Sequence, residues 1–227
     1  MSGVIAVLMA VLIPVGLKAR QSAERAEELA TLKQYAVALF SYEIDHQGRL
    51  PFFGEPRRPV DDLVFESGRV GTGTAGSAAI VLHTFYWCSA IVPYMSSWDG
   101  LPYRVRLWPA PLFDDLRETG AFQSPVYMTS SAFADASLWR QSDTYSKDGY
   151  RPQTVAAARY PSRKILLSAF GARDTDGMPV VMVDRSVQLV DPATIRPGFE
   201  PTGLFPFSIN THLPGAATLN GFSGFDF

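Results

Sequence analysis

The first seventeen residues carry no charged side chain and run without a break into a long helical pattern. A cleaved signal peptide has basic residues before its apolar core and small residues at a cleavage site behind it. In this chain the basic residues Lys18, Arg20 and Arg25 come only after the apolar core. The order of these features predicts a hydrophobic helix that stays attached to the rest of the protein.

This apolar segment is slightly too short to span a membrane by itself. At about 1.5 Å per residue, the seventeen residues reach roughly 26 Å, whereas about 20 residues are needed to span the hydrocarbon core of a membrane. Pro14 removes one helical hydrogen bond, which membrane helices tolerate better than soluble ones. Two interpretations follow: a plain membrane anchor that inserts incompletely, or a segment that has further residues upstream.

The apolar segment is expected to continue as an amphipathic helix to about residue 47. Gly48 suits the position after a helix end, and Pro51 blocks continuation. Apolar residues at spacings of three and four predict one stripe that packs the helix on the head domain. The residues of this stripe are Leu29, Leu32, Ala36, Leu39 and Phe40. A helix of about 45 residues is near 68 Å long. A domain of this size cannot cover it, so its N-terminal half is expected to lie in a membrane or in a bundle of like helices.

The rest of the chain predicts a head domain of short strands joined by long loops. The whole chain has 17 Pro and 18 Gly, most of them in this part, and they favour shaped loops. Apolar runs at 164–169 and 179–183 flank a turn-rich stretch and predict a β-hairpin, with a further short strand at 187–190. The run 78–95 fits either a second helix or a buried strand. The apolar tail 205–227 is expected to lie against the sheet or a neighbouring subunit.

These elements predict an α+β fold in which a long N-terminal helix packs on a small antiparallel sheet. We divide the chain into an apolar helix segment (1–17), its amphipathic continuation (18–50) and a globular head (51–227). The net charge of −2 argues against a nucleic-acid-binding protein, which shows a basic stripe. The single Cys88 excludes an intrachain disulfide framework.

Three local patterns resemble binding or catalytic sites, and each also has a purely structural interpretation. A G-x-G-x-x-G pattern at 71–76 binds dinucleotides only between a strand and a helix, and no clear strand leads into it, so we interpret it as a surface loop. His83 and Cys88 lack an orienting acid and are expected to be buried or half-buried. Asp174 and Asp176 offer two carboxylates, whereas calcium takes six or more oxygens. A hairpin turn is the favoured interpretation there, and a calcium site is the alternative.

The helical region also carries a fairly specific combination of residues. An aliphatic run and a proline precede a Lys-Ala-Arg step, an Ala/Arg/Glu-rich helix, a Leu-Lys-Gln phrase and a closing Tyr, His, Gly and Pro. These places are occupied by Pro14, Lys18, Ala19, Arg20, Thr31, Leu32, Lys33, Gln34, Tyr42, His46, Gly48 and Pro51. This region, about a fifth of the chain, resembles the N-terminal region of type IV pilin-like proteins, which include the type II secretion pseudopilins. Weaker echoes follow at 92–94 and 160–165.

The sequence departs from that family at its start. The family carries a short basic leader, a cleavage site and a Phe-Thr-Leu-Ile-Glu-like opening, whose Glu is thought to pair with a neighbour's terminal amine during assembly. None of these precedes the aliphatic run here, so that Glu maps to no position. We expect that the given sequence begins several residues past the opening, through a misplaced start or trimming.

The resemblance implies a structural subunit of a type IV pilus-like or type II secretion pseudopilus filament, with no enzymatic activity and no cofactor. Such a subunit is anchored in the bacterial inner membrane with its head in the periplasm, and it then joins copies of itself or other pilin-like subunits in a periplasmic or extracellular filament. No nucleic-acid partner is expected. The residues expected to pack in the filament core or membrane are Val4, Ile5, Val7, Leu8, Val11, Leu12, Ile13 and Pro14.

Two other interpretations remain open. One is a membrane-tethered periplasmic ligand-binding or enzymatic domain that uses a pilin-like anchor. It predicts a pocket with convergent polar groups and perturbed acids, which the sequence does not reveal. The other is a minor pseudopilin at the filament tip, which does not polymerise alone.

Overall fold

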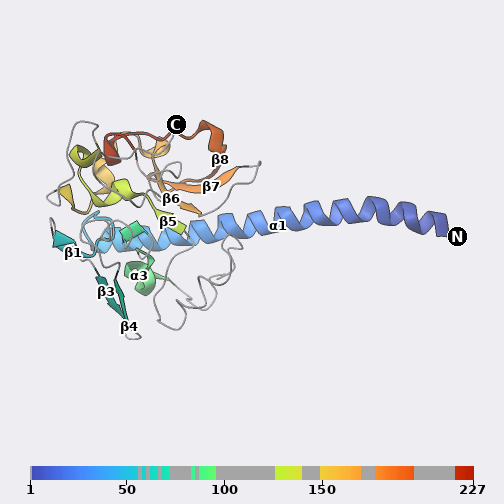
Figure 1. The fold of residues 1–227 in the computed structure, drawn as a ribbon, viewed down its shortest axis with the longest axis horizontal. Coiled ribbons are helices and arrows are strands. Elements are labelled where there is room, and N and C mark those ends of the chain that lie inside the picture. The colour runs from blue at the N-terminus through green and yellow to red at the C-terminus, as the bar shows by residue number, and fades with distance from the viewer. Residues whose placement is uncertain are drawn as a thin grey trace.

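A computed structural model of the protein describes residues 2–55, 58–59, 62–65, 68–71, 83–84, 87–95, 126–139, 149–169, 177–196 and 218–227. In these ranges one long helix, α1 (Ser2–Asp45), runs into a head built around a four-stranded antiparallel sheet. The N-terminal part of α1 projects far beyond the head, and the N-terminus lies at its free end (Figure 1). The structure thus confirms the predicted α+β layout of a long N-terminal helix on a small antiparallel sheet.

Helix α1 is 44 residues long and continues through Pro14. It ends at Asp45, two residues before the expected end, and Gly48 beyond it adopts a positive φ of 77° and donates its N–H to the Glu43 carbonyl at 2.7 Å. A left-handed glycine just after a helix satisfies the last free carbonyls and turns the chain away. The chain then enters the head at Leu50, whose N–H donates to the Gln153 carbonyl at 2.9 Å.

The main sheet has the order β5-β6-β7-β8, and every neighbouring pair is antiparallel. Its strands are β5 (Val126–Met128), β6 (Ile165–Ala169), β7 (Met178–Met182) and β8 (Val187–Val190). The strands expected at 164–169, 179–183 and 187–190 are therefore confirmed to within one residue. Strand β5 is an addition that the sequence pattern does not reveal.

Two small hairpins precede the sheet. Strand β1 (Gly54–Glu55) pairs with β2 (Arg58–Pro59), and β3 (Asp62–Phe65) pairs with β4 (Gly68–Gly71). The expectation that no strand leads into the glycine-rich pattern is wrong, because β4 ends at Gly71. That strand belongs to an antiparallel two-stranded hairpin and not to a parallel βαβ unit, and residues 72–82 lie outside the described part of the chain.

Short helices complete the described head. In the run 78–95, where helix and strand were both open, the structure forms α3 (Cys88–Ile91) and the 3-10 turn η1 (Val92–Tyr94). Further 3-10 turns are η2 (Ser130–Phe133), η3 (Ala136–Trp139), η5 (Val155–Ala157), η6 (Pro161–Arg163), η7 (Pro192–Thr194) and η8 (Gly221–Ser223).

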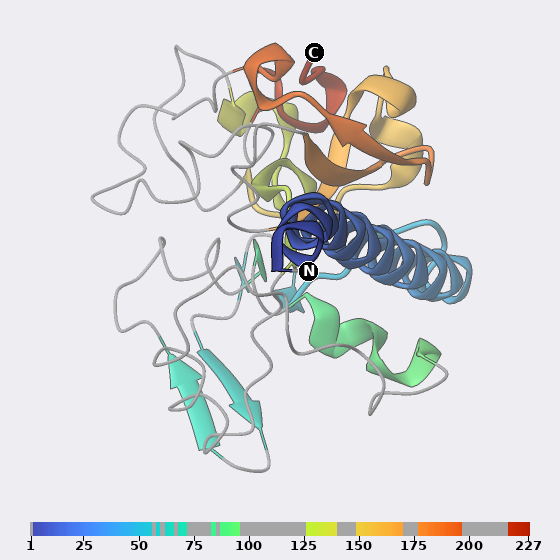
Figure 2. The same ribbon diagram turned by 90° about the vertical axis from the view of Figure 1, so that its right-hand side faces the viewer.

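The C-terminal half of α1 lies between the sheet on one side and α3 with η1 on the other (Figure 2). On the sheet side the buried core includes Leu167 and Val181, and on the other side it includes Trp87 and Ile91. The indole N–H of Trp87 donates to the Val126 carbonyl at 3.0 Å, so this large ring is both packed and hydrogen-bonded. Burial on two sides fixes the helix firmly in the head.

The described end of the C-terminal tail packs on the sheet, as expected. Phe222 is buried, and the Asp226 side chain accepts a hydrogen bond from the N–H of Ile165, the first residue of β6, at 2.7 Å. Gly221 has a positive φ of 59°, and a Cβ there would lie 2.3 Å from Cδ1 of Trp139. The close approach of tail and indole therefore requires glycine at this position. Residues 205–217 lie outside the described part of the chain.

Candidate assembly surface on the long helix

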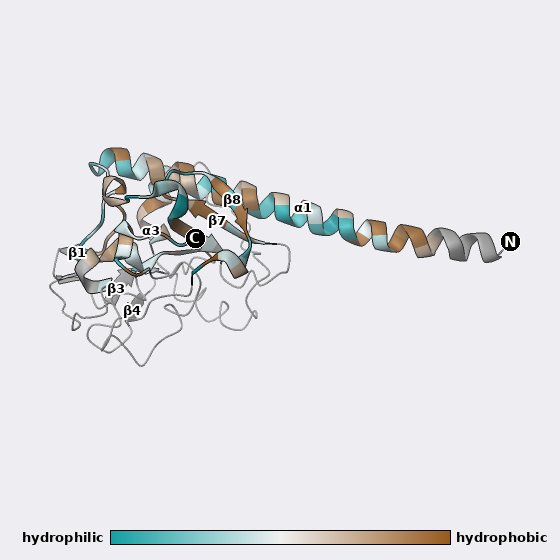
Figure 3. Cartoon of the chain, turned by 90° about the horizontal axis from the view of Figure 1, so that it is seen from above, coloured by the Kyte–Doolittle hydropathy of each residue, from teal (hydrophilic) through white to brown (hydrophobic). Residues whose placement is uncertain are grey.

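The projecting part of α1 exposes large apolar side chains on all its sides. Every residue from 9 to 23 is exposed, and the large hydrophobic residues are between 54% and 61% exposed. These large residues are Met9, Val11, Leu12, Ile13, Val15 and Leu17. Figure 3 shows this stretch as a brown section of α1 beyond the head, followed by a teal, polar section. A helix that is apolar all round is normally buried in a membrane or among other helices.

Half of the residues predicted to pack in a filament core fall in this stretch. Val11, Leu12, Ile13 and Pro14 are exposed on the projecting helix. The other four belong to α1, but their side chains lie outside the described part of the structure; they are Val4, Ile5, Val7 and Leu8. Across the described residues, no helix combines the length and the apolar character needed to cross a membrane.

The stripe predicted to pack on the head is correct for Leu32, Ala36 and Leu39, which are buried, while Leu29 is half-buried. The prediction for Phe40 is wrong, because this side chain is 53% exposed. Consecutive residues in an α-helix point about 100° apart, so when Leu39 faces the core Phe40 turns toward its flank. The sequence alone did not resolve this, since residue 40 also fits the three-and-four spacing.

The buried face of α1 is also broader than the predicted stripe. It includes Thr31, Tyr35, Ala38 and Glu43, because the head contacts the helix from two sides. The side chain of Tyr35 packs on Trp87 with ring centroids 5.6 Å apart. A single stripe of spacing three and four predicts one contact face, and it cannot show a second face beside it.

An ion pair closes the end of α1 against the sheet. Glu43 is almost fully buried, and Nη2 of Arg185 donates to its Oε1. Arg185 sits in the β7–β8 turn with a positive φ of 72°. Burial raises the pKa of Glu43, and the neighbouring guanidinium opposes this rise. The two residues are 142 positions apart, so no local pattern announces the pair.

A second buried cluster holds the tail. Lys164 and Asp226 are fully enclosed, with Nζ 3.2 Å from Oδ1, and the Thr218 hydroxyl bonds to both side chains. Burial lowers the pKa of Lys164, and the charge of Asp226 opposes this shift. Because solvent does not reach these groups, the cluster stabilises the packing of the C-terminal tail and is not accessible to a substrate.

The residues weighed as sites lie as follows. His83 and Cys88 are buried, as predicted, and Nε2 of His83 accepts a hydrogen bond from the N–H of Phe53 at 2.9 Å. Asp174 and Asp176 lie outside the described residues. In the described part of the chain, no three His, Cys, Asp or Glu side chains come together as a metal site requires.

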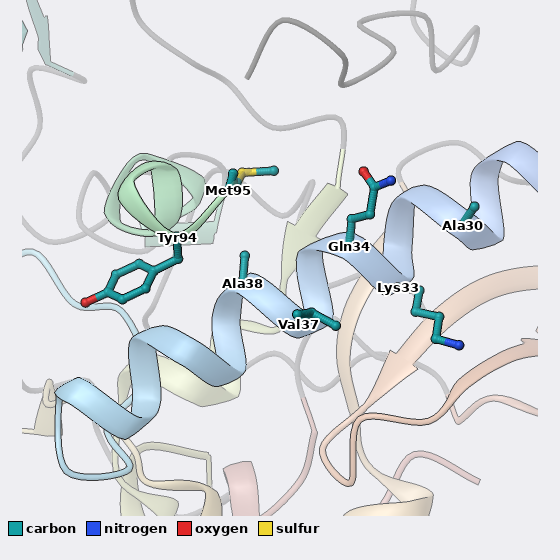
Figure 4. Close-up of a pocket in the computed structure, with 7 residues that line it drawn as sticks. All are labelled: Ala30, Lys33, Gln34, Val37, Ala38, Tyr94 and Met95. Carbon is teal, nitrogen blue, oxygen red and sulfur yellow. The ribbon is translucent and has the colours of Figure 1, made fainter. Parts of the chain in front are cut away.

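A cleft of about 440 Å³ opens between α1 and η1. Its described lining consists of Ala30, Lys33, Gln34, Val37, Ala38, Tyr94 and Met95. Figure 4 shows Tyr94 and Met95 above the helix, on the side toward which Gln34 and Ala38 point. The lining is mostly apolar, with one cation and no acid among these residues, so it favours contact with an apolar surface over acid–base chemistry.

Comparison of the sequence with family models, with curated proteins and with solved structures finds no match. Helix α1 offers an apolar end that the head leaves uncovered and, several turns further along the same helix, a mostly apolar cleft on the head.

Proposed function

We propose that the protein is a structural subunit of a pilin-like filament, of the type IV pilus or type II secretion pseudopilus kind. Before assembly its N-terminal helix anchors it in the bacterial inner membrane with the head in the periplasm. One observation carries this proposal: residues 9–17 expose six large apolar side chains on a helix that is continuous with the core of the head.

The energy of covering these side chains supports an assembly with many neighbours. Full burial of a large apolar side chain is worth about 1.5–3 kcal/mol, so side chains that are just over half exposed contribute about 1–1.5 kcal/mol each. Six of them offer roughly 6–9 kcal/mol. Association of two bodies costs about 4–15 kcal/mol, so a single pairwise contact on this helix is weak. A membrane, or a bundle that surrounds the helix, covers all sides at once.

The remaining support comes from the way the helix is held and from the residues along it. The head holds α1 from Thr31 to Glu43, and the apolar end continues the same helix beyond the head. A contact between the apolar end of one subunit and a different surface of the next repeats without closing, which generates a filament. The resemblance to pilin-like proteins around Pro14 and Lys18–Arg20 points to the same arrangement.

The experiment compares the full chain with a variant that lacks residues 1–17, both expressed in a bacterium and purified, the full chain in mild detergent. The full chain is expected in the inner-membrane fraction and to form high-mass assemblies when the detergent is diluted. The truncated variant is expected to be monomeric and equally stable to urea, because residues 9–23 lie outside the buried core.

A matched pair of point variants tests the apolar character itself. Leu12→Asp places a charge on the apolar end and is expected to abolish assembly, whereas Gln21→Asp adds the same charge at an exposed polar position and is expected to preserve it. The proposal is wrong if the full chain stays monomeric in membranes and after detergent dilution, while the truncated variant turns over a substrate or binds a small ligand tightly.

A further inference from the structure

An exposed face extends along nearly the whole of α1. Its members return every three or four residues, which places them on one side of a helix. All are exposed, and all but one serine and one lysine are apolar. We call this face the outer seam; it consists of Leu12, Val15, Ala19, Ser22, Ala26, Ala30, Lys33, Val37, Phe40 and Ile44.

The head leaves the C-terminal end of the outer seam open. Val37, Phe40 and Ile44 are between 53% and 65% exposed, although Ala36 and Leu39 beside them are buried in the core. Val37 also lines the cleft between α1 and η1, so the open end of the seam continues into a hollow on the head (Figure 4). Large apolar side chains gathered beside a hollow mark an interaction surface.

The two ends of the seam match each other in spacing. The interval from Leu12 to Val15 to Ala19 is three and then four residues, and the interval from Val37 to Phe40 to Ile44 is the same. The offset is 25 residues in each case, since 37 − 12, 40 − 15 and 44 − 19 all equal 25. A shift of 25 residues is about 38 Å and very nearly seven whole turns. When two parallel copies of α1 are shifted by this amount, residues 12–19 of one copy therefore lie beside residues 37–44 of the other.

Charge and direction favour the shifted parallel arrangement over its alternatives. In an unshifted parallel pair, Lys33 faces Lys33 of the second copy, and like charges at such a seam are destabilising. In an antiparallel pair the spacing of the second copy reads four and then three, so the middle pair, Val15 and Phe40, is out of step by one residue.

We propose that the surface formed by Val37, Phe40 and Ile44 receives residues 12–19 of a second copy of this chain, parallel and displaced by about 38 Å along the helix. This inference deepens the proposed function and rests on it, because it specifies which part of the head contacts the apolar end of a neighbour. Each subunit offers one apolar end and one receiving surface, so the contact repeats from subunit to subunit without closing.

Cross-linking between singly substituted full-length chains tests the register. The variants Leu12→Cys, Val15→Cys, Val37→Cys and Phe40→Cys are assembled in mixtures by detergent dilution and treated with a short bismaleimide. Native Cys88 is buried and serves as the unreactive background. Cross-linked dimers are expected in the mixtures that pair position 12 with 37 and position 15 with 40, and at much lower yield when either variant of a pair is assembled alone.

A control variant and the possible contrary outcomes distinguish the shifted contact from the filament function. Gln21→Cys, on the side of α1 away from the outer seam, is expected to give no product when mixed with Phe40→Cys. If Val15→Cys cross-links to itself in assemblies while neither mixed pair reacts, the filament function stands and the shifted contact is wrong. If Phe40→Cys reacts mainly with itself, an unshifted pair replaces the shifted one. If no variant cross-links and the chains remain monomeric, the proposed function fails as well.

Discussion

Leu39 and Phe40 are neighbours on α1 with opposite surroundings, and replacing each by alanine tests how the helix is seated. Leu39 is fully buried in the main core of the head, whereas Phe40 is 53% exposed. By residue size alone, the loss of phenylalanine is expected to cost more. The structure predicts the reverse order for the free energy of unfolding.

The magnitudes follow from burial. Truncation of a buried leucine removes its transfer free energy and leaves a cavity, so Leu39→Ala is expected to cost about 2–5 kcal/mol. Phe40 hides just under half of its side chain, and full burial of a phenylalanine is worth about 1.5–3 kcal/mol, so Phe40→Ala is expected to cost about 1 kcal/mol. No cavity term applies, because solvent already reaches the Phe40 ring.

The assay is urea unfolding of the full chain in mild detergent, followed by circular dichroism. A shift of the midpoint without a change of slope reports a change of stability alone. Ile44→Ala is the matched control, since Ile44 is 65% exposed on the same face as Phe40, and it is expected to cost less than about 1 kcal/mol.

An equal or larger loss for Phe40→Ala than for Leu39→Ala refutes the reasoning. Such a result means that α1 is rotated by about 100° about its axis, with residue 40 in the core in place of residue 39. The outer seam then loses Val37 and Ile44 as exposed members, and the docking surface proposed for a second copy disappears with it.

Three further predictions concern the buried charges. Asp226→Ala leaves Lys164 enclosed without its charged partner and is expected to cost about 3–5 kcal/mol in urea unfolding. The pKa of Lys164 is lower in the folded state than its usual 10.5, so between the two values the unfolded chain binds more protons and the contribution of this residue to stability increases with pH. Urea titrations from pH 8 to 10.5 should show this increase, and Lys164→Met should abolish it. Glu43→Ala leaves the guanidinium of Arg185 largely buried without an acceptor and is expected to cost about 2–4 kcal/mol, measured by the same unfolding midpoint.

The parts of the fold that could be predicted from sequence are those with local signals. The extent of α1 follows from its spacing and from Gly48 at its end, and β6, β7 and β8 follow from apolar runs around turn-forming residues. Each of these signals lies within one continuous stretch of the sequence. The direction in which the helix faces is only partly local, which is why Leu32, Ala36 and Leu39 were predicted correctly and Phe40 was not.

The unpredicted features depend on contacts between distant segments. Glu43 meets Arg185 across 142 positions, and Lys164 meets Asp226 across 62. Each charged residue taken alone looks like a solvated surface residue, because a buried charge is recognisable only beside its partner. Strand β5 is only three residues long, which is too short to show an alternating pattern, so its pairing with β6 also becomes visible only in the fold.

The shifted contact also explains why the apolar segment of α1 ends where it does. With a displacement of 25 residues, residue 19 of one copy faces Ile44 of the next, and α1 ends one residue later at Asp45. Residues 21–28 of the first copy then have no helix opposite them. Those residues are polar or small, and the Arg20–Glu24 ion pair at their start is exposed. A longer apolar segment would leave hydrophobic side chains without cover, so the end of the receiving helix accounts for the switch to charged residues after Leu17.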